Sequence, residues 1–153
     1  MMELDATDRR LLRALQKSGR LSNAELSEAV SLSPSACHRR VARLEREGVI
    51  AGYAALLDRD AVGRRVTVFV EITLAGQTEE AFDAFEAAVR RIPEVLECHM
   101  TAGGADYLLK VVVADSEDFA DLHRRRLAKL PGVSKMQSSF SLRRVRETTE
   151  LPV

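Results

Sequence analysis

Four arginines lie within one short segment, at positions 39, 40, 43 and 46. From Ser33 to Arg46 the only acidic side chain is Glu45. Guanidinium groups bind phosphate oxygens and the O6 and N7 atoms of guanine, so a cluster of this kind could serve to bind DNA. An ordinary solvated helix face can carry several arginines too. The predicted secondary structure around the cluster distinguishes between these two interpretations.

The arginines fall in a predicted helix that runs from Pro34 to about Glu47. Ser33 is a suitable N-cap, and proline fits the first helical position because its missing N–H has no partner there in any case. Gly48 follows as a typical end of a helix.

The two faces of this helix differ in composition. One face is an apolar stripe made by Cys37, Val41 and Leu44. The opposite face carries Ser35, Arg39, Ala42 and Arg46, with Ala36 and Arg43 beside them. This places small residues in the first turn and arginines behind them, which suits a helix that enters a major groove about 12 Å wide.

Two shorter helices are predicted before this one. Asp5 is a candidate N-cap for a helix over about residues 6–18, and Ser22 with Glu25 has the capping-box spacing before a second helix. Three helices with the arginines on the last predict a helix-turn-helix unit. The stretch GVIAGY after it predicts a short strand that resembles a wing.

The rest of the chain predicts strand, helix, strand, strand, helix, strand. Residues 66–74 alternate and are rich in β-branched side chains, and residues 103–105 form a turn between two further strands. Thr78 and Ser116 are the expected N-caps of the two helices, and the last strand is expected from Val133 to about Val145. This order is the ferredoxin-like βαββαβ topology, so the fold class is α+β. The predicted domains are residues 1–52 and 66–153, joined by a hinge strand over 53–65.

Composition limits the other possibilities. The chain has 153 residues and 23 basic and 23 acidic side chains, so net charge by itself indicates no polyanionic partner. Cys37 and Cys98 lie far apart without metal-ligand spacing, so we expect no metal, no disulfide and a reducing compartment. We also expect no cofactor. The N-terminus lacks an apolar signal region, and no segment has the roughly 20 apolar residues of a membrane span. We therefore expect a cytoplasmic protein that does not bind a membrane.

Several stretches together resemble one family in order and spacing. They are LDATDRRLLRALQKSGRLSNAELSEAVSLSPSACHRRVARLEREGVIAGYAALLD, VFVEITL, PEVLECHMTAGGADYLLKV and LPGV. The chain is similar over nearly its whole length to the Lrp/AsnC family of transcription factors. The resemblance implies an N-terminal winged helix-turn-helix that binds an operator in double-stranded DNA. It also implies a ferredoxin-like C-terminal domain that dimerises, assembles further, to an octamer, and senses a small molecule, usually an amino acid.

The resemblance also implies which residues act. The recognition helix would be residues 34–47, with phosphate contacts from Arg40 or Arg46. Its DNA-facing residues would be Ser35, Ala36, His38, Arg39 and Arg43. A dimer would present two such helices, so a pseudo-palindromic operator is expected.

The family holds its effector near the loop between the two middle strands of the second domain, at a Gly-x-x-Asp motif that matches Gly103 and Asp106. Members often have Ser or Thr followed by Gly-Asp there, whereas this chain has Ala102, Gly103 and Gly104. Ser138 matches a Thr position in the last strand. Glycine would let backbone N–H groups approach a carboxylate, and the aspartate could pair with an ammonium group. Alternatively, Asp106 only stabilises a turn.

The sequence therefore predicts a DNA-binding regulator that responds to an amino acid or a related small molecule. A ligand-independent architectural DNA-binding protein is the alternative, favoured by the altered loop. A small enzyme is the third class, but His38, His99 and His123 are scattered and no catalytic constellation is recognisable, so we expect no catalysis.

Overall fold

A computed structural model of the chain describes residues 3–153, and the first two residues of the predicted N-terminal domain lie outside the described part. The fold consists of two compact units. One holds the described residues up to Leu56 together with Arg146–Val153, and the other holds Leu57–Val145. Residues 146–153, which the sequence assigned to the second domain, group with the first unit in this division.

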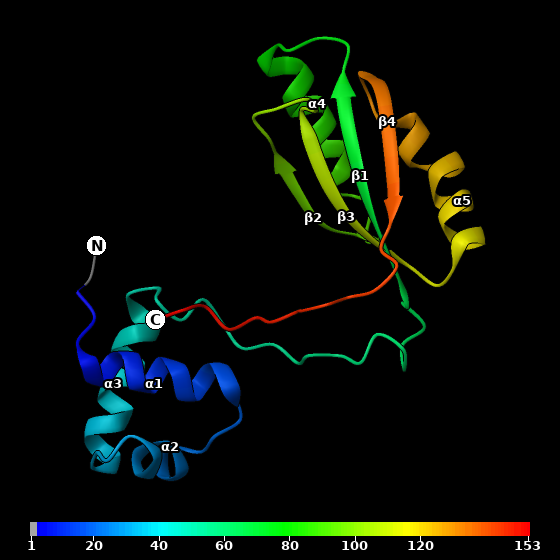
Figure 1. The fold of residues 1–153 in the computed structure, drawn as a ribbon. Coiled ribbons are helices and arrows are strands. Elements are labelled where there is room, and N and C mark those ends of the chain that lie inside the picture. The colour runs from blue at the N-terminus through cyan, green and yellow to red at the C-terminus, as the bar shows by residue number, and fades with distance from the viewer. Residues whose placement is uncertain (1–2) are drawn as a thin grey trace. The chain divides into compact units, whose positions relative to one another are not determined.

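The first unit contains three helices, α1 (Ala6–Lys17), α2 (Asn23–Ala29) and α3 (Pro34–Arg46) (Figure 1). Their apolar stripes meet in a small core. The buried side chains in it are those of Leu11, Leu26, Val30 and Cys37, and Leu44 is also fully buried. The predicted apolar stripe of the third helix is therefore confirmed as its packed face.

The helix starts follow the predicted capping residues. Ser22 and Glu25 form a reciprocal capping box, and the Ser33 hydroxyl accepts a hydrogen bond from the backbone N–H of Ala36. Asp5 caps α1 as predicted, and its partner in a second capping box is Asp8, which the sequence reasoning did not single out.

The turn between α2 and α3 passes through a left-handed residue that is not glycine. Ser31 has φ 56°, and the next N–H, that of Leu32, donates to the carbonyl of Ser27. The Asn23 side chain also donates to the carbonyl of Pro34 at 2.8 Å. These contacts fix the approach of α3 to α2.

The predicted wing strand is not formed within the described chain. The N–H groups of Val49 and Ile50 both donate to the carbonyl of Leu44, and no residue from 47 to 65 is assigned to a strand. A strand needs a neighbour that accepts its backbone hydrogen bonds, and this segment has none beside it within its own unit.

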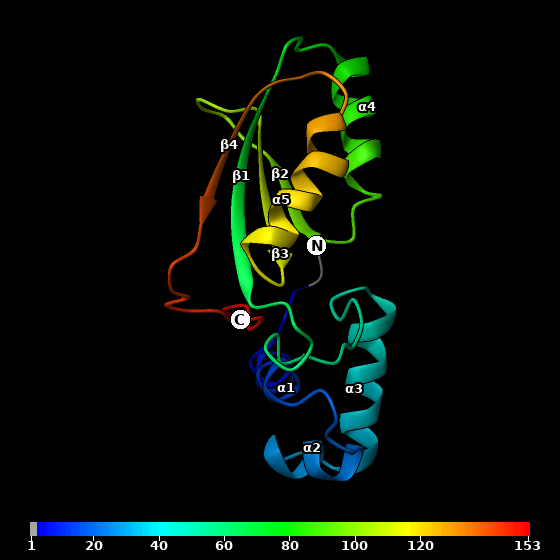
Figure 2. The same cartoon turned by 90° about the vertical axis from the view of Figure 1, so that its right-hand side faces the viewer.

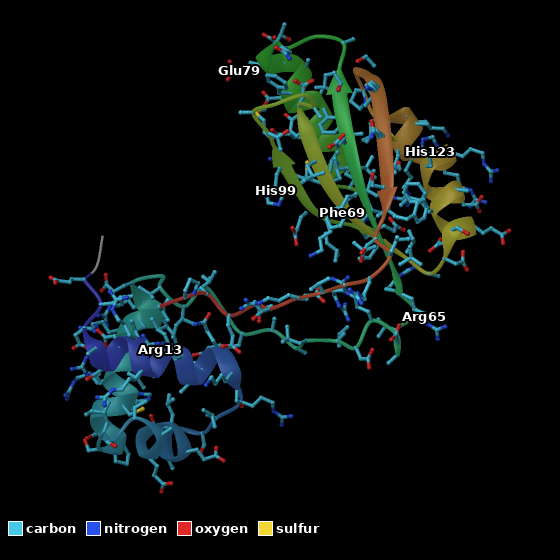
Figure 3. The ribbon with its side chains drawn as sticks, in the orientation of Figure 1. Arg13, Arg65, Phe69, Glu79, His99 and His123 are labelled. Carbon is cyan, nitrogen blue, oxygen red and sulfur yellow. The ribbon has the colours of Figure 1, made fainter. Side chains whose placement is uncertain are left out.

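The C-terminal segment contacts α1. The Gln16 side-chain amide donates to the carbonyl of Leu151 at 3.1 Å and accepts from its N–H at 2.6 Å. Arg13 Nε donates to the carbonyl of Val153 at 2.7 Å; the arginine is labelled in Figure 3. Side chains of α1 thus bind the backbone of the tail, which explains why the tail belongs to the first unit.

The second unit contains the predicted βαββαβ order. Its elements are β1 (Val66–Leu74), α4 (Glu79–Val89), β2 (Val95–Met100), β3 (Tyr107–Val113), α5 (Ser116–Arg125), a 3-10 turn (Leu127–Lys129) and β4 (Val133–Phe140). The strands form one antiparallel sheet in the order β2-β3-β1-β4 (Figure 1). The ferredoxin-like fold class is confirmed.

Both helices cover the same face of this sheet (Figure 2). Alternate residues of β1, Val68, Val70 and Ile72, are fully buried against them. The intervening residue Phe69 is 40% exposed and lies on the other face of the sheet. One face of the sheet is therefore core, and the opposite face has no helix of this unit over it.

Two predicted boundaries are wrong. The last strand ends at Phe140 and not near Val145, because its ladder with β1 ends at the pair of Phe140 with Val68. The cap of α5 is Asp115 and not Ser116: its carboxylate accepts from the N–H groups of Glu117 and Asp118 at 2.9 Å each.

None of the helices described here has the length and apolar character needed to cross a membrane. Within residues 3–153, no group of three or more His, Cys, Asp and Glu side chains could hold a metal ion. Cys37 is a buried free thiol and Cys98 an exposed one.

Candidate DNA-binding and effector sites

The predicted DNA-facing residues of α3 fall into two groups. Ser35, His38 and Arg39 are exposed and Ala36 is half-buried, all in the first half of the helix. Arg39 takes part in no ion pair with any residue of the described chain, so its guanidinium is available to an external anion. These side chains are accessible to solvent, and their contact with DNA stays a prediction.

Arg40 and Arg43 are held by α1 instead. Arg40 Nη1 lies 2.7 Å from Asp5 Oδ2 and 2.8 Å from Asp8 Oδ1. Arg43 Nη2 lies 2.6 Å from Asp8 Oδ2. The Asp8 side chain is only 1% exposed, whereas those of Arg40 and Arg43 are 31% and 38% exposed. These two arginines tie α3 to α1 and retain one partly exposed side.

The electrostatics of this cluster are consistent with strong pairing. Hydrogen bonding from the Asp8 backbone, aided by the Arg40 guanidinium, lowers the pKa of Asp5 to about 2. The same contacts with Asp5 and Asp8 raise the pKa of Arg40. Both groups therefore stay charged across the ordinary pH range.

At the C-terminal end of α3, Arg46 lies 3.3 Å from Glu47 Oε1, with both side chains well exposed. Exposed pairs of this kind are weak, so this arginine can still exchange its partner for a phosphate. The face of α3 thus offers Arg39 without an ionic partner in the described chain and Arg46 after release from one weak pair. Arg40 and Arg43 are available only in competition with Asp5 and Asp8.

The predicted effector loop connects β2 to β3. Thr101 closes it: its hydroxyl donates to the Ala105 carbonyl at 2.7 Å, and its N–H donates to the Asp106 carbonyl at 2.9 Å. Gly103 and Gly104 lie at the exposed tip between these contacts. The loop is therefore anchored at its base and open at its tip.

Asp106 is half-buried and hydrogen-bonded within its own unit. One carboxylate oxygen accepts from the N–H of Leu74 at 2.7 Å and the other from the Gln77 side chain at 2.9 Å. These contacts continue the join between β3 and β1 beyond the last ladder pair, Ile72 with Tyr107. They tie the start of β3 to the end of β1 and to the segment that follows it. A role of Asp106 in ligand binding, and its alternative role in the turn at residues 103–105, both stay predictions.

The two glycines of the loop are not demanded by the fold of the chain. Neither has φ in the left-handed region, and a Cβ built on Gly103 or Gly104 meets no atom within 4 Å. Residues with side chains would therefore fit here without strain. A side chain at this tip would be excluded only if a molecule from outside the unit approaches the backbone there.

Ser138 is not brought to this loop within one unit. It pairs with Val70 in the middle of β1, and β1 separates its strand from β3. A site that uses both Ser138 and the loop would need parts of two chains.

A cavity of about 120 Å³ lies between α4 and the strands that flank the loop. In it Tyr107 Oη donates to Glu86 Oε1 at 3.0 Å, and Arg90 pairs with the other Glu86 oxygen at 3.0 Å. Burial and the hydrogen bond to Glu86 raise the pKa of Tyr107. The sequence reasoning missed this cavity, because its lining comes from α4, β2 and β3 and shares no motif. Its lining residues are Glu86, Val89, Arg90, Cys98, Met100 and Tyr107.

Comparison with known families matches both units. Residues 4–51 match a model of winged helix-turn-helix DNA-binding domains, and residues 67–151 match the Lrp/AsnC ligand binding domain. The chain belongs to the Lrp/AsnC family. It is thus a DNA-binding transcriptional regulator that carries a ligand-binding domain, as the sequence predicted.

Curated relatives of this Lrp/AsnC protein include two leucine-responsive regulatory proteins. The one from Salmonella typhimurium is 43% identical over 99% of this chain and 92% of the relative, and the one from Escherichia coli K12 is 42% identical over the same shares. These relatives are regulatory proteins rather than enzymes.

Solved structures of the family agree with the fold. A transcriptional regulator from Neisseria meningitidis in complex with L-Met superimposes with TM-score 0.93 at 41% identity, covering 98% of this chain and 97% of that one. An AsnC family regulator from Agrobacterium tumefaciens gives TM-score 0.94 at 39% identity, covering 97% of both chains.

Proposed function

We propose that this regulator recognises a pseudo-palindromic operator through the exposed face of α3, with Ser35, Ala36, His38 and Arg39 toward the bases. The observation that carries the proposal is the exposed side chain of Arg39, which has no ionic partner among residues 3–153 and follows a slim, capped first turn. A helix end with small side chains can approach base edges closely, and an arginine one turn later reaches guanine or a phosphate. The target is genomic DNA, so we infer a cytoplasmic protein.

We further propose that the ligand of the second unit is an amino acid. The name of the leucine-responsive relatives and the L-Met complex of the Neisseria regulator support this class. At the loop tip, the backbone N–H groups of Gly103 and Gly104 would receive the carboxylate. A carboxylate has about four acceptor positions, so Asp106 could still accept from an ammonium group beside its contacts with Leu74 and Gln77.

The assembly that we propose is a homodimer that associates further, to an octamer. Two chains would bring two α3 helices to two half-sites, and would bring Ser138 of one chain toward a loop of another. A ligand bound at such an interface would shift operator affinity only if it binds two arrangements of the assembly with different affinity.

A thermal-shift screen against the twenty amino acids tests the ligand. A ligand at a hundred times its Kd should stabilise the native protein by about 2.7 kcal/mol. We expect one or a few amino acids to raise the Tm of the wild type. Gly104→Val should abolish the shift, because its side chain blocks the approach to the backbone without disturbing the fold.

Gly76→Val is the matched control. Gly76 is also exposed, outside the left-handed region and free of contacts at a built Cβ. It should keep the amino-acid shift. An unchanged shift in Gly104→Val would contradict the proposed site, and no shift in the wild type would favour the architectural alternative, to which the loop with Ala102 and Gly104 already points.

DNA binding is tested with Arg39→Ala, measured as Kd against a duplex selected by the wild-type protein from random sequences. We expect a loss of about fivefold to a hundredfold, corresponding to one guanine or phosphate contact. Arg65→Ala, an exposed arginine of the second unit with a 3.8 Å contact to Asp60, is the control and should bind as the wild type does. Equal losses in both variants would contradict the assignment of α3.

A further inference from the structure

The charges cancel within one cluster, which is made of Asp5, Asp8, Arg40 and Arg43. Two carboxylates meet two guanidinium groups at 2.6 to 2.8 Å, so the four charges cancel. Each oxygen of the buried Asp8 has its own arginine, and Asp8 Oδ2 also accepts the Asp5 N–H at 3.2 Å. Half of the arginines on the recognition helix are therefore neutralised by α1.

Stability alone gives little reason for this arrangement. Taking a carboxylate out of water is costly, and well-packed apolar side chains often stabilise a fold as well as a buried ion pair does. Arg43 Nε is in addition buried without a hydrogen-bond partner. The cluster thus combines a buried charge with an unsatisfied donor, next to the face that would meet DNA.

Non-specific affinity for DNA depends on how many phosphates a protein neutralises. Arg39 and Arg46 can bind phosphates at almost no cost, but Arg40 and Arg43 would have to leave or share Asp8. The partner of both arginines sits 1% exposed in the helical core, so it is fixed in place and always competes with the phosphates.

We propose that Asp8 is a positioning residue that limits the sequence-independent affinity for DNA: it restrains Arg40 and Arg43 from indiscriminate phosphate contacts. The inference rests on the proposed binding through α3 and adds a residue of α1 to it. Asp8 does not touch DNA in this scheme. It lowers the sequence-independent part of the affinity and leaves discrimination to the exposed face of α3.

The test is Asp8→Asn, which keeps the shape of the side chain and removes its charge. The Kd is measured from 50 to 300 mM NaCl for two duplexes of equal length: one selected by the wild type from random sequences, and a scrambled one. We expect the variant to bind the scrambled duplex more tightly. Each released arginine should steepen the slope of log K against log salt by about 0.9, so a change of about one to two is expected.

Asp121→Asn is the matched control. Asp121 also holds two arginines, Arg124 at 2.6 Å and Arg125 at 3.3 Å, but on α5. It makes the same change in net charge without releasing an arginine of α3, and it should leave the slope unchanged. Adding Arg40→Gln and Arg43→Gln to Asp8→Asn should return the slope to the wild-type value or below it.

A folded Asp8→Asn protein with wild-type slope and wild-type affinity for the scrambled duplex would overturn the inference, as would a shallower slope. If Asp8→Asn does not fold, Asp5→Asn releases one contact of Arg40 from a side chain that is 51% exposed, and it should steepen the slope by less than one. An unchanged slope in that variant would equally overturn the inference. Failure of the wild type to bind any duplex would reject the proposed function itself.

Discussion

At the scale of single residues, the chemistry of the candidate DNA interface depends on which arginines are already paired. The sequence shows four similar arginines, yet Arg39 has no ionic partner in the described chain, whereas Arg40 and Arg43 share the buried Asp8. Helical spacing places Arg40 and Arg43 on the flank of α3, between its apolar stripe and its exposed face. Residue type alone therefore overstates the positive charge that this helix can offer to DNA.

The lowered pKa of Asp5 predicts a specific pH dependence of stability. A carboxyl group whose pKa falls from 3.8 to about 2 on folding stabilises the native state above pH 3.8, and this contribution is lost as the pH falls toward 2. The Tm difference between the wild type and Asp5→Asn should thus be constant from pH 7 to about pH 5 and shrink below pH 4.

The measurement is thermal unfolding at closely spaced pH values. In an Arg40→Gln background the effect of Asp5→Asn should be smaller, since Arg40 is one cause of the shift. A Tm difference that grows as the pH falls below 4 would contradict the assignment.

At the scale of elements, α3 is defined by its ends. Ser33 caps the first turn at Ala36, and Ser31 makes the preceding turn with φ 56°, where residues other than glycine are uncommon. The angle at which α3 leaves α2 therefore depends on a strained residue followed by a cap.

Ser33→Ala should cost about 1 kcal/mol of stability and should also weaken operator binding, because the frayed turn is the one that carries Ser35 and Ala36. Thr78→Ala is the matched control: Thr78 caps α4 by the same contact, at 3.3 Å to the Ala81 N–H. It should cost a similar amount in urea unfolding and leave DNA affinity unchanged. A loss of affinity in both variants would show that the effect is not local to α3.

Ser31→Gly should stabilise the first unit by up to about 1 kcal/mol, because glycine adopts left-handed φ without the steric cost that serine carries. Chemical unfolding followed by circular dichroism measures the change. Ser18→Gly serves as a comparison, since Ser18 has φ −150° and gains nothing from glycine. Destabilisation by Ser31→Gly would contradict the interpretation of the turn.

At the scale of the whole molecule, the sheet face opposite α4 and α5 is a candidate interface with another chain. Phe69 lies near the middle of β1 and is 40% exposed, on the face opposite to the buried Val68 and Val70. A second chain with the same face would cover it, which agrees with the proposed dimer.

Phe69→Lys should weaken self-association by at least about tenfold, because a lysine must be desolvated where an aromatic ring was buried. Val62→Lys adds the same charge at a 50% exposed residue of the same unit outside the sheet and should have no effect. Light scattering across a dilution series measures both. Equal dissociation constants for self-association of the wild type and Phe69→Lys would contradict an interface on this sheet face.

Much of the fold follows from local sequence signals. Asp5, Ser22, Ser33 and Thr78 were predicted as caps and act as caps. The alternation over residues 66–74 also gave its strand correctly, because the side-chain period of a strand and the hydrogen bonds of a cap depend on neighbours in the chain.

The tertiary structure decided what depends on distant neighbours. It paired Asp8 with Arg40 and Arg43 across more than thirty residues, tied Asp106 to Leu74, and ended the last strand at its final pair with β1. The predicted wing strand after α3 also has no partner strand in the described chain. The sequence by itself determined the family, the helices and the candidate residues, since these reside in short patterns of type and spacing. Which charged side chains are paired and which are unpaired depends on the distances between elements. Only the folded chain sets these distances.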